Sequence, residues 1–119
     1  MSSAPLSSTP PGIRLGPLDL IADGKARNFV IEMKAGRFHG FVVRRGGAVH
    51  GYIDRCAHMA LPLAQQLDQY LTDDGAFIEC SWHGALYEID SGRCVGGPCV
   101  GRSLTRWPVR VEDGTIVTA

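Results

Sequence analysis

The apolar residues of this chain occur in short runs that are separated by turns rich in glycine and aspartate. Short runs with β-branched and aromatic residues favour strands over helices. The predicted strands cover residues 28–33, 38–44, 48–53, 76–79, 85–88, 106–112 and 115–118. Gly46-Gly47 predicts a tight hairpin turn between the second and third of these strands. No long helical pattern is present, and Pro62 limits any helical turn within residues 61–70.

Many short strands with frequent glycine turns predict an all-β fold, either an antiparallel sandwich or a small barrel. At 119 residues the chain is long enough for one domain with its own core. Residues 1–12 are rich in serine and proline and are expected to form a flexible tail. The folded domain is therefore expected to span residues 13–119.

The charge balance argues against a nucleic-acid partner, because twelve basic residues are offset by twelve acidic ones. No apolar stretch approaches the roughly 18 residues that cross a membrane, so no membrane association is expected. The N-terminus lacks the basic region and apolar core of a signal peptide, which favours a cytoplasmic location. Four cysteines in such a protein favour metal binding over structural disulfides.

Two short motifs combine cysteine with histidine. They are Cys56-Ala57-His58 and Cys80-Ser81-Trp82-His83, and twenty-one residues separate them. Each motif follows a predicted strand, so the four side chains are expected on loops at one end of a β scaffold. A thiolate and an imidazole from each of two loops suit a site in which two sulfur ligands hold one metal ion and two nitrogen ligands hold another.

Zinc is the main alternative metal, because two cysteines and two histidines also make a tetrahedral structural site. The usual zinc arrangements pair cysteine with cysteine and histidine with histidine, whereas this chain mixes them within each motif. His39 and His50 are isolated on predicted strands and are interpreted as ordinary core or surface residues.

The pattern Cys-x-His…Cys-x-x-His resembles the Rieske [2Fe–2S] family, and the resemblance extends over about residues 38–117. The run from His83 through Gly84 to Tyr87 and the later Gly96-Gly97-Pro98 are similar to the second cluster-binding loop and the covering proline loop of that family. The resemblance implies three antiparallel sheets, with one [2Fe–2S] cluster per chain at the tip of a small subdomain. It further implies that Cys56 and Cys80 hold the inner iron and that His58 and His83 hold the outer iron.

Three further residues are expected to tune the cluster. Gly84 lets the backbone approach it, and Tyr87 is expected to donate its hydroxyl to the sulfur of Cys56. Ala85 stands where high-potential members have a serine whose hydroxyl bonds a bridging sulfide. Hydrogen-bond donors to sulfur stabilise the reduced cluster, and this chain has fewer of them than the high-potential members. We therefore expect its reduction potential to lie near the low end of the range of the Rieske family.

The resemblance also implies that the disulfide of the high-potential members is absent from this chain. High-potential members carry an extra cysteine in each cluster loop, joined by a disulfide, and the matching positions here are Leu61 and Trp82. Cys94 and Cys99 are expected to be buried thiols rather than a disulfide.

Apolar residues beside the ligands are expected to shield the cluster or to form a docking rim around the histidines: Met59, Leu61, Pro62, Trp82 and Pro98.

The chain lacks the parts of a self-sufficient oxidoreductase. The 36 residues after the second motif contain no histidine for a mononuclear iron site, and no G-x-G-x-x-G follows a strand. We therefore expect an electron-transfer component rather than an enzyme on its own: a ferredoxin that passes electrons from a flavin-dependent reductase to a terminal, ring-hydroxylating oxygenase. The alternatives are a small Rieske subunit of a larger redox enzyme, such as a nitrite reductase-like assembly, and a zinc-stabilised binding module.

Overall fold

The computed structural model describes residues 8–55, 63, 68–80 and 84–119, and within these ranges the regular structure is almost entirely β. The strands are β1 (Arg14–Pro17), β2 (Ala26–Met33), β3 (Gly36–Arg45), β4 (Ala48–Ile53), β5 (Phe77–Glu79), β6 (Leu86–Glu88), β7 (Cys94–Gly96), β8 (Val109–Glu112) and β9 (Thr115–Thr118). One 3₁₀-helix, η1 (Leu18–Leu20), follows β1. Over the described ranges, no helix has the length and apolar character needed to cross a bilayer. The predicted all-β class is confirmed.

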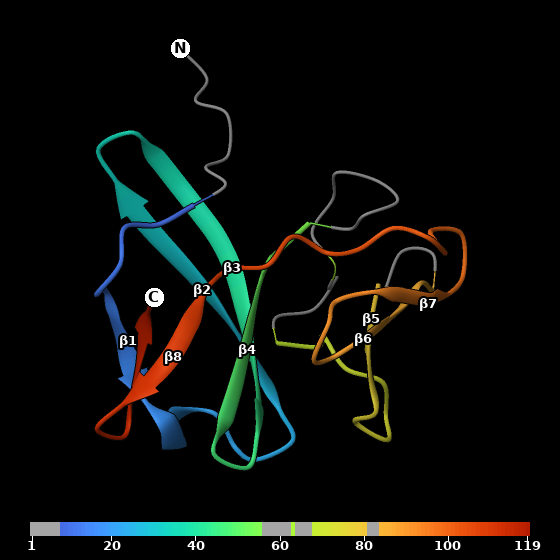
Figure 1. The fold of residues 1–119 in the computed structure, drawn as a ribbon, viewed down its shortest axis with the longest axis horizontal. Coiled ribbons are helices and arrows are strands. Elements are labelled where there is room, and N and C mark those ends of the chain that lie inside the picture. The colour runs from blue at the N-terminus through green and yellow to red at the C-terminus, as the bar shows by residue number, and fades with distance from the viewer. Residues whose placement is uncertain (1–7, 56–62, 64–67, 81–83) are drawn as a thin grey trace.

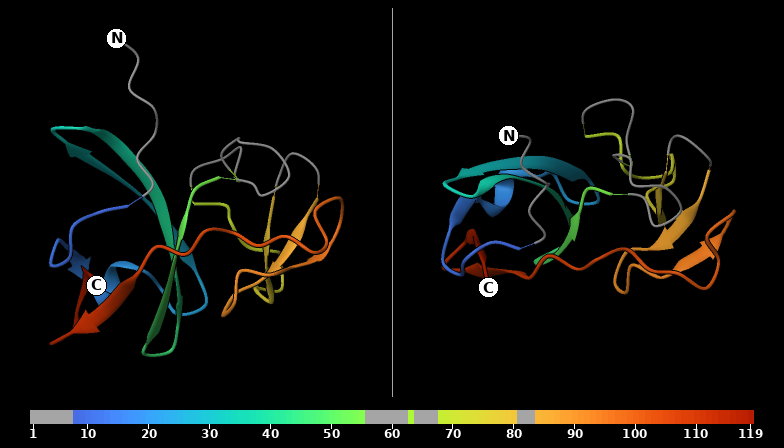
Figure 2. Two further views of the ribbon diagram at one scale, coloured as in Figure 1. Left: turned by 45° about the horizontal axis from the view of Figure 1, so that its top comes forward. Right: turned by 90° about the horizontal axis from the view of Figure 1, so that it is seen from above.

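These strands form three antiparallel sheets of three strands each. Sheet A has the order β1-β9-β8, sheet B the order β2-β3-β4, and sheet C the order β5-β6-β7. Sheets A and B lie together at one end of the molecule, and sheet C lies at the other end, as both views in Figure 2 show. The small sheet C therefore stands apart from the other six described strands (Figure 1), as the three-sheet expectation requires.

Strand β3 connects the two halves of the core because it is buried on both of its faces. Side chains alternate between the two faces of a strand. Phe41 and Val43 belong to the buried cluster that continues into sheet C. Phe38 and Val42 belong to a second buried cluster, which continues toward sheet A and contains Trp107. A central strand that is packed on both sides needs this nearly unbroken apolar run.

Trp107 packs so closely on β3 that one position of that strand has no room for a side chain. Its ring lies 4.8 Å, centroid to centroid, from the ring of Phe38. A Cβ atom at Gly40 would lie 2.6 Å from Trp107 Cε3 and 2.7 Å from Phe38 Cε1. Glycine at this position is therefore a packing requirement of the inner cluster.

Gly40→Ala is expected to destabilise the fold by about 1–3 kcal/mol, because the added methyl group overpacks the cluster around Trp107. Gly47→Ala is the matched control, since no atom lies within 4 Å of a Cβ there. The control should change stability by no more than about 0.5 kcal/mol. Urea unfolding of both variants measures the difference, and equal unfolding free energies would contradict the packing argument.

The N-terminal part of the described chain contacts the domain before the expected boundary at residue 13. Trp107 Nε1 donates to Thr9 Oγ1 at 2.9 Å, and Thr118 Oγ1 donates to the Pro10 carbonyl at 2.8 Å. Gly12 N donates to Thr118 O at 2.8 Å. These bonds lead the chain into β1, a strand that the sequence pattern did not predict.

Candidate metal centre

The second Cys/His motif begins at the end of the β5–β6 hairpin. Strands β5 and β6 pair as far as Glu79↔Leu86. Beyond this pair, Cys80 N donates to Ala85 O and Gly84 N donates to Cys80 O, each at 2.9 Å. Gly84 has φ +69, a conformation that glycine adopts without strain. These bonds hold Cys80 at the tip of the hairpin, with its side chain 0% exposed.

The loop after β7 lies directly on the backbone of this segment. A Cβ atom at Gly97 would lie 2.8 Å from Ala85 Cα and 3.2 Å from Ala85 N, and Gly97 has φ +87. A Cβ atom at Gly96 would make only ordinary contacts with Leu86, at 3.6 Å and beyond. Of the two glycines in the predicted covering loop, Gly97 is therefore the one that the close approach requires.

Cys94 and Cys99 form a buried thiol pair under this loop. Their sulfur atoms lie 2.7 Å apart, and neither is in a disulfide, as expected from the sequence. The Cys99 sulfur also lies 3.1 Å from the Tyr87 hydroxyl, within hydrogen-bond distance, while the Cys94 thiol donates to Gly96 O at 3.2 Å. A hydroxyl donates one hydrogen bond and accepts others, so the Tyr87 oxygen can bond to more than one sulfur. The described contacts of Tyr87 are thus compatible with its predicted role as a donor to Cys56, which lies outside the described residues.

The first Cys/His motif is bracketed by two described residues. Asp54 Oδ1 accepts a hydrogen bond from Leu63 N at 2.9 Å, so the two flanks of segment 55–62 meet. The flank at Leu63 is anchored in the buried cluster that contains Cys80. Both motifs are therefore attached to one core.

Several predicted site residues lie outside the described residues: Cys56, His58, Met59, Leu61, Pro62, Trp82 and His83. Within the described ranges, no group of three or more metal-ligating side chains occurs. The two histidines that were interpreted as ordinary are described. His39 is exposed, and burial lowers the pKa of the partly buried His50, with the Asp90 carboxylate opposing that effect.

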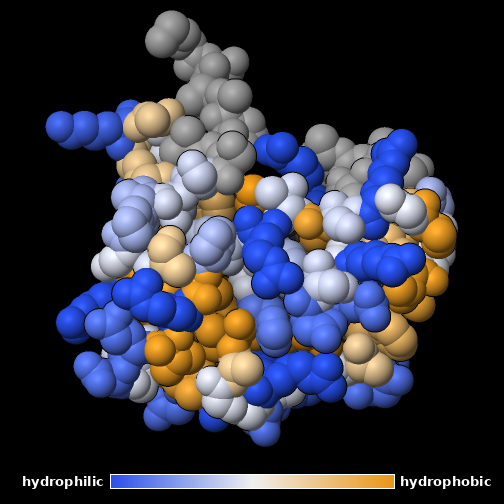
Figure 3. Space-filling view, in the orientation of Figure 1, coloured by the Kyte–Doolittle hydropathy of each residue, from blue (hydrophilic) through white to orange (hydrophobic). Residues whose placement is uncertain are grey.

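Sequence reasoning missed two exposed apolar side chains near this site. Val95 on β7 is 45% exposed, and Val100 in the following loop is 65% exposed. Pro98, which was predicted to belong to the rim, is also exposed. Apolar side chains gather at the end of the molecule where β7 and its loop lie (Figure 3). A sequence pattern cannot distinguish these valines from core valines, because their exposure depends on how the loop folds back.

The described strands form three antiparallel sheets, and a buried cysteine lies at the tip of the sheet with the shortest strands. The family of the Rieske [2Fe-2S] domain matches residues 18–112. The chain belongs to this family, and its cofactor is a [2Fe–2S] cluster.

Similar proteins come from dioxygenase systems. The chain is 40% identical over 63 residues to the ferredoxin component of the p-cumate 2,3-dioxygenase system of Pseudomonas putida, and this match covers 53% of the chain and 49% of that protein. The chain thus spans about half the length of this curated relative. The ferredoxin of carbazole 1,9a-dioxygenase from Nocardioides aromaticivorans IC177 has a TM-score of 0.69 at 22% identity, covering 93% of this chain and 98% of that one. A chain in the complex of reduced oxygenase and oxidised ferredoxin of carbazole 1,9a-dioxygenase has a TM-score of 0.70 at 23% identity, covering 90% and 91%.

The described residues fit an iron–sulfur cluster. Cys80 supplies a fully buried thiol, the soft ligand that such clusters require. The Tyr87 hydroxyl lies in the same buried cluster as Cys80, where a donor to sulfur is expected.

Tyr87→Phe is expected to lower the midpoint potential of the cluster, because loss of a donor to sulfur disfavours the reduced state. A hydrogen bond worth about 0.5–1.5 kcal/mol corresponds to roughly 20–60 mV for one electron. Tyr52→Phe is the matched control, since this buried hydroxyl donates to Ile89 O at 2.6 Å and burial raises its pKa to about 12. Redox titration followed by visible absorbance measures both variants. If both variants showed the same shift of midpoint potential, or if Tyr87→Phe showed none, Tyr87 would not tune the cluster.

Proposed function

We propose that this chain is a one-electron carrier, the ferredoxin component of a Rieske-type oxygenase system. It accepts electrons from a flavin-dependent reductase and passes them to a terminal oxygenase that acts on an aromatic ring. The observation that carries this proposal is the 40% identity with a ferredoxin component of a dioxygenase system. The alternation of one-electron uptake and release is what a bound [2Fe–2S] cluster supplies.

The proposed ligands are Cys56 and Cys80 for the inner iron and His58 and His83 for the outer iron. The complete burial of Cys80 supports an inner position for the sulfur ligands, because a thiolate away from water is protected from exchange and oxidation. The Gly84 turn at the hairpin tip is exposed and supports an outer position for the neighbouring His83.

We assign the docking face to the end of the molecule that carries Val95, Pro98 and Val100. The contact between Gly97 and Ala85 places this loop against the second ligand segment, so a partner seated on these side chains approaches the cluster. An exposed apolar patch of this kind suits transient association. Cys94 and Cys99 are neighbouring free thiols, which persist in a reducing compartment. This supports the cytoplasm as the place where the protein acts.

The test is electron transfer by the purified holoprotein. When the holoprotein is mixed with NADH and a flavin reductase from a Rieske dioxygenase system, its visible absorbance should be bleached. Adding a terminal oxygenase with its aromatic substrate under oxygen should then restore the absorbance. A protein that dithionite reduces but no such reductase does, and that copurifies with a large subunit, would instead be the small subunit of a larger redox enzyme.

The zinc-stabilised module is tested by composition. Two iron atoms and two acid-labile sulfides per chain are expected from anaerobically prepared protein. One zinc ion per chain, with neither iron nor labile sulfide, would end the carrier proposal.

A further inference from the structure

A carboxylate at the end of β4 collects three hydrogen bonds from three separate segments. Asp54 Oδ1 accepts from Leu63 N at 2.9 Å. Its other oxygen, Oδ2, accepts from the Tyr70 hydroxyl at 2.8 Å and from Asn28 Nδ2 at 3.2 Å. Hydrogen bonds to an ionised carboxylate are stronger than bonds between neutral groups. Asp54 therefore joins β2, β4 and the chain after the first motif.

The bond between Asp54 and Leu63 spans the segment that carries two of the proposed ligands. On one side, Asp54 N donates to His39 O at 3.0 Å, and the preceding Ile53 pairs with Gly40 in sheet B. On the other side, the Leu63 side chain is 0% exposed. One carboxylate thus links a fixed strand end to a buried anchor, and the proposed ligands Cys56 and His58 lie between the two in the sequence.

The other two donors hold the carboxylate in place. Asn28 Nδ2 donates to the Tyr70 hydroxyl at 2.7 Å, and the Tyr70 ring stacks on Phe41 with centroids 4.2 Å apart. Burial, together with the Asp54 charge, raises the pKa of Tyr70 far above its ordinary value, so its hydroxyl remains a donor at any working pH. Phe41 lies in sheet B, which gives this part of the network a rigid base.

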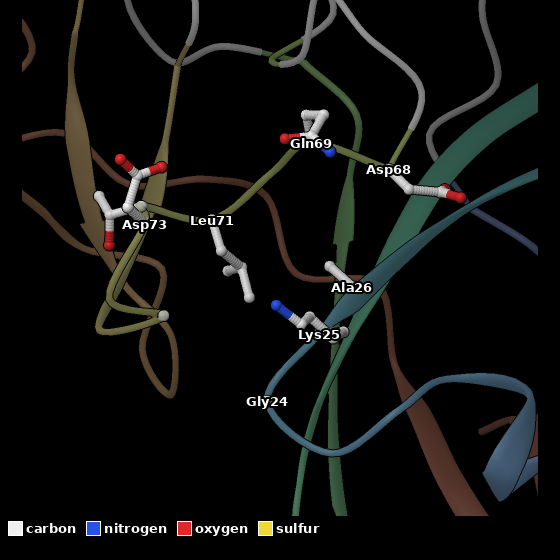
Figure 4. A pocket seen from close by; sticks show the side chains of 9 residues that line it. Gly24, Lys25, Ala26, Asp68, Gln69, Leu71 and Asp73 are labelled. Carbon is white, nitrogen blue, oxygen red and sulfur yellow. The ribbon is translucent and has the colours of Figure 1, made fainter.

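A second carboxylate ties the same part of the chain to the edge of sheet B. Asp68 Oδ1 accepts from the backbone N of Asn28 at 2.7 Å. A polar cavity of about 170 Å³ lies between the start of β2 and segment 68–75, and at its edge the Asp68 carboxylate points away from Leu71 (Figure 4). Asn28 is therefore bonded through both its backbone and its side chain to the segment that follows the first motif.

We propose that Asp54 is a positioning residue for the cluster, whose carboxylate clasps the two flanks of the first ligand segment so that its cysteine and histidine stay within reach of the iron atoms. This inference rests on the proposed ligand set, and it deepens the proposed function by naming a residue outside that set. The carboxylate acts through the backbone of Leu63, and no contact of Asp54 with the cluster is invoked.

The test compares the rate of cluster loss in Asp54→Ala, Asp54→Asn and Asp74→Ala holoproteins. Asp74 is the matched control because its carboxylate also accepts from one backbone amide, Ala76 N at 3.0 Å, and from one hydroxyl, Thr72 Oγ1 at 2.6 Å. The decay of visible absorbance in excess iron chelator, well below the unfolding temperature, gives the rate. Circular dichroism of the same samples reports whether the fold persists.

Asp54→Ala is expected to lose its cluster about 10–100 times faster than wild type, the size of effect typical of residues that orient metal ligands. Asp54→Asn should recover part of this loss, because its amide oxygen still accepts from Leu63 N. Asp74→Ala should match wild type. The electron paramagnetic resonance signal of reduced Asp54→Ala should also broaden, which a purely structural role would not cause.

Equal rates in Asp54→Ala and Asp74→Ala would overturn the clasp, and so would a loss of cluster that follows unfolding in both Asp54 variants. A Tyr70→Phe variant keeps the Leu63 bond and should retain its cluster better than Asp54→Ala; the opposite order would also contradict the proposal. A wild-type protein that binds no iron would instead defeat the proposed function, so the two failures are distinguishable.

Discussion

Cys80→Ala is expected to abolish cluster binding while the protein stays folded. Iron–sulfur clusters are held by thiolates, and alanine offers no ligand atom in place of Cys80 Sγ. The side chain is 0% exposed, so no solvent molecule can readily take over the ligand position. Cys80 is not part of the buried cluster around Trp107, which includes residues of sheets A and B. We therefore expect retained circular dichroism together with loss of nearly all iron, acid-labile sulfide and visible absorbance.

Cys94→Ala is the matched control for that experiment, because it removes a thiol that is equally buried, at 2% exposure, from the same core cluster. Cys94 is not a proposed ligand, and its thiol donates to Gly96 O at 3.2 Å. The control should keep its colour and its full iron content. If Cys94→Ala lost the cluster and Cys80→Ala kept it, the ligand assignment of the second motif would be wrong.

Gly97→Ala is expected to weaken both the fold and the hold on the cluster. The left-handed backbone at φ +87 costs an alanine about 1–2 kcal/mol. In addition, the new Cβ would lie 2.8 Å from Ala85 Cα, and because that neighbour is backbone the loop itself must shift, at a further cost of about 1–3 kcal/mol. The shift lifts the loop from the second ligand segment, so faster cluster loss in chelator should accompany the lower unfolding free energy.

Gly101→Ala separates the two causes. Gly101 has φ +94 in the same loop region, but no atom lies within 4 Å of a Cβ there. This variant should show the backbone cost alone and should keep its cluster as long as wild type does. Urea unfolding and the absorbance decay measure both variants, and similar cluster lifetimes for Gly97→Ala and Gly101→Ala would show that the covering contact does not matter.

The central hairpins were predictable because their signals are local. The predicted strands 28–33, 38–44 and 48–53 lie within β2, β3 and β4. The turn predicted at Gly46-Gly47 connects β3 to β4. The strand Arg14–Pro17 was missed because it exists through pairing with β9, where Arg14 lies opposite Val117. The short β7 was missed as well, since it has only three residues and an irregular register with β6.

For the site, the chemistry of the residues was enough to indicate the cofactor class. A cysteine and a histidine at close spacing, repeated once, restrict the metal centres that a chain can hold, and this restriction does not depend on the fold. The family match confirms that inference. The positions of Gly84, Ala85 and Tyr87 on the second hairpin likewise follow from short distances along the chain.

Residue types and short-range spacing therefore determined the all-β class and the iron–sulfur cofactor, because turns, strands and ligand pairs depend on near neighbours. The packing of three sheets decided the rest: that Asp54 reaches Leu63 and Tyr70, and that Gly97 lies on Ala85. It also left Val100 exposed while the adjacent Cys99 is buried. Such contacts join segments far apart in the sequence, and the choice among possible partners is made only when the sheets close around a common core.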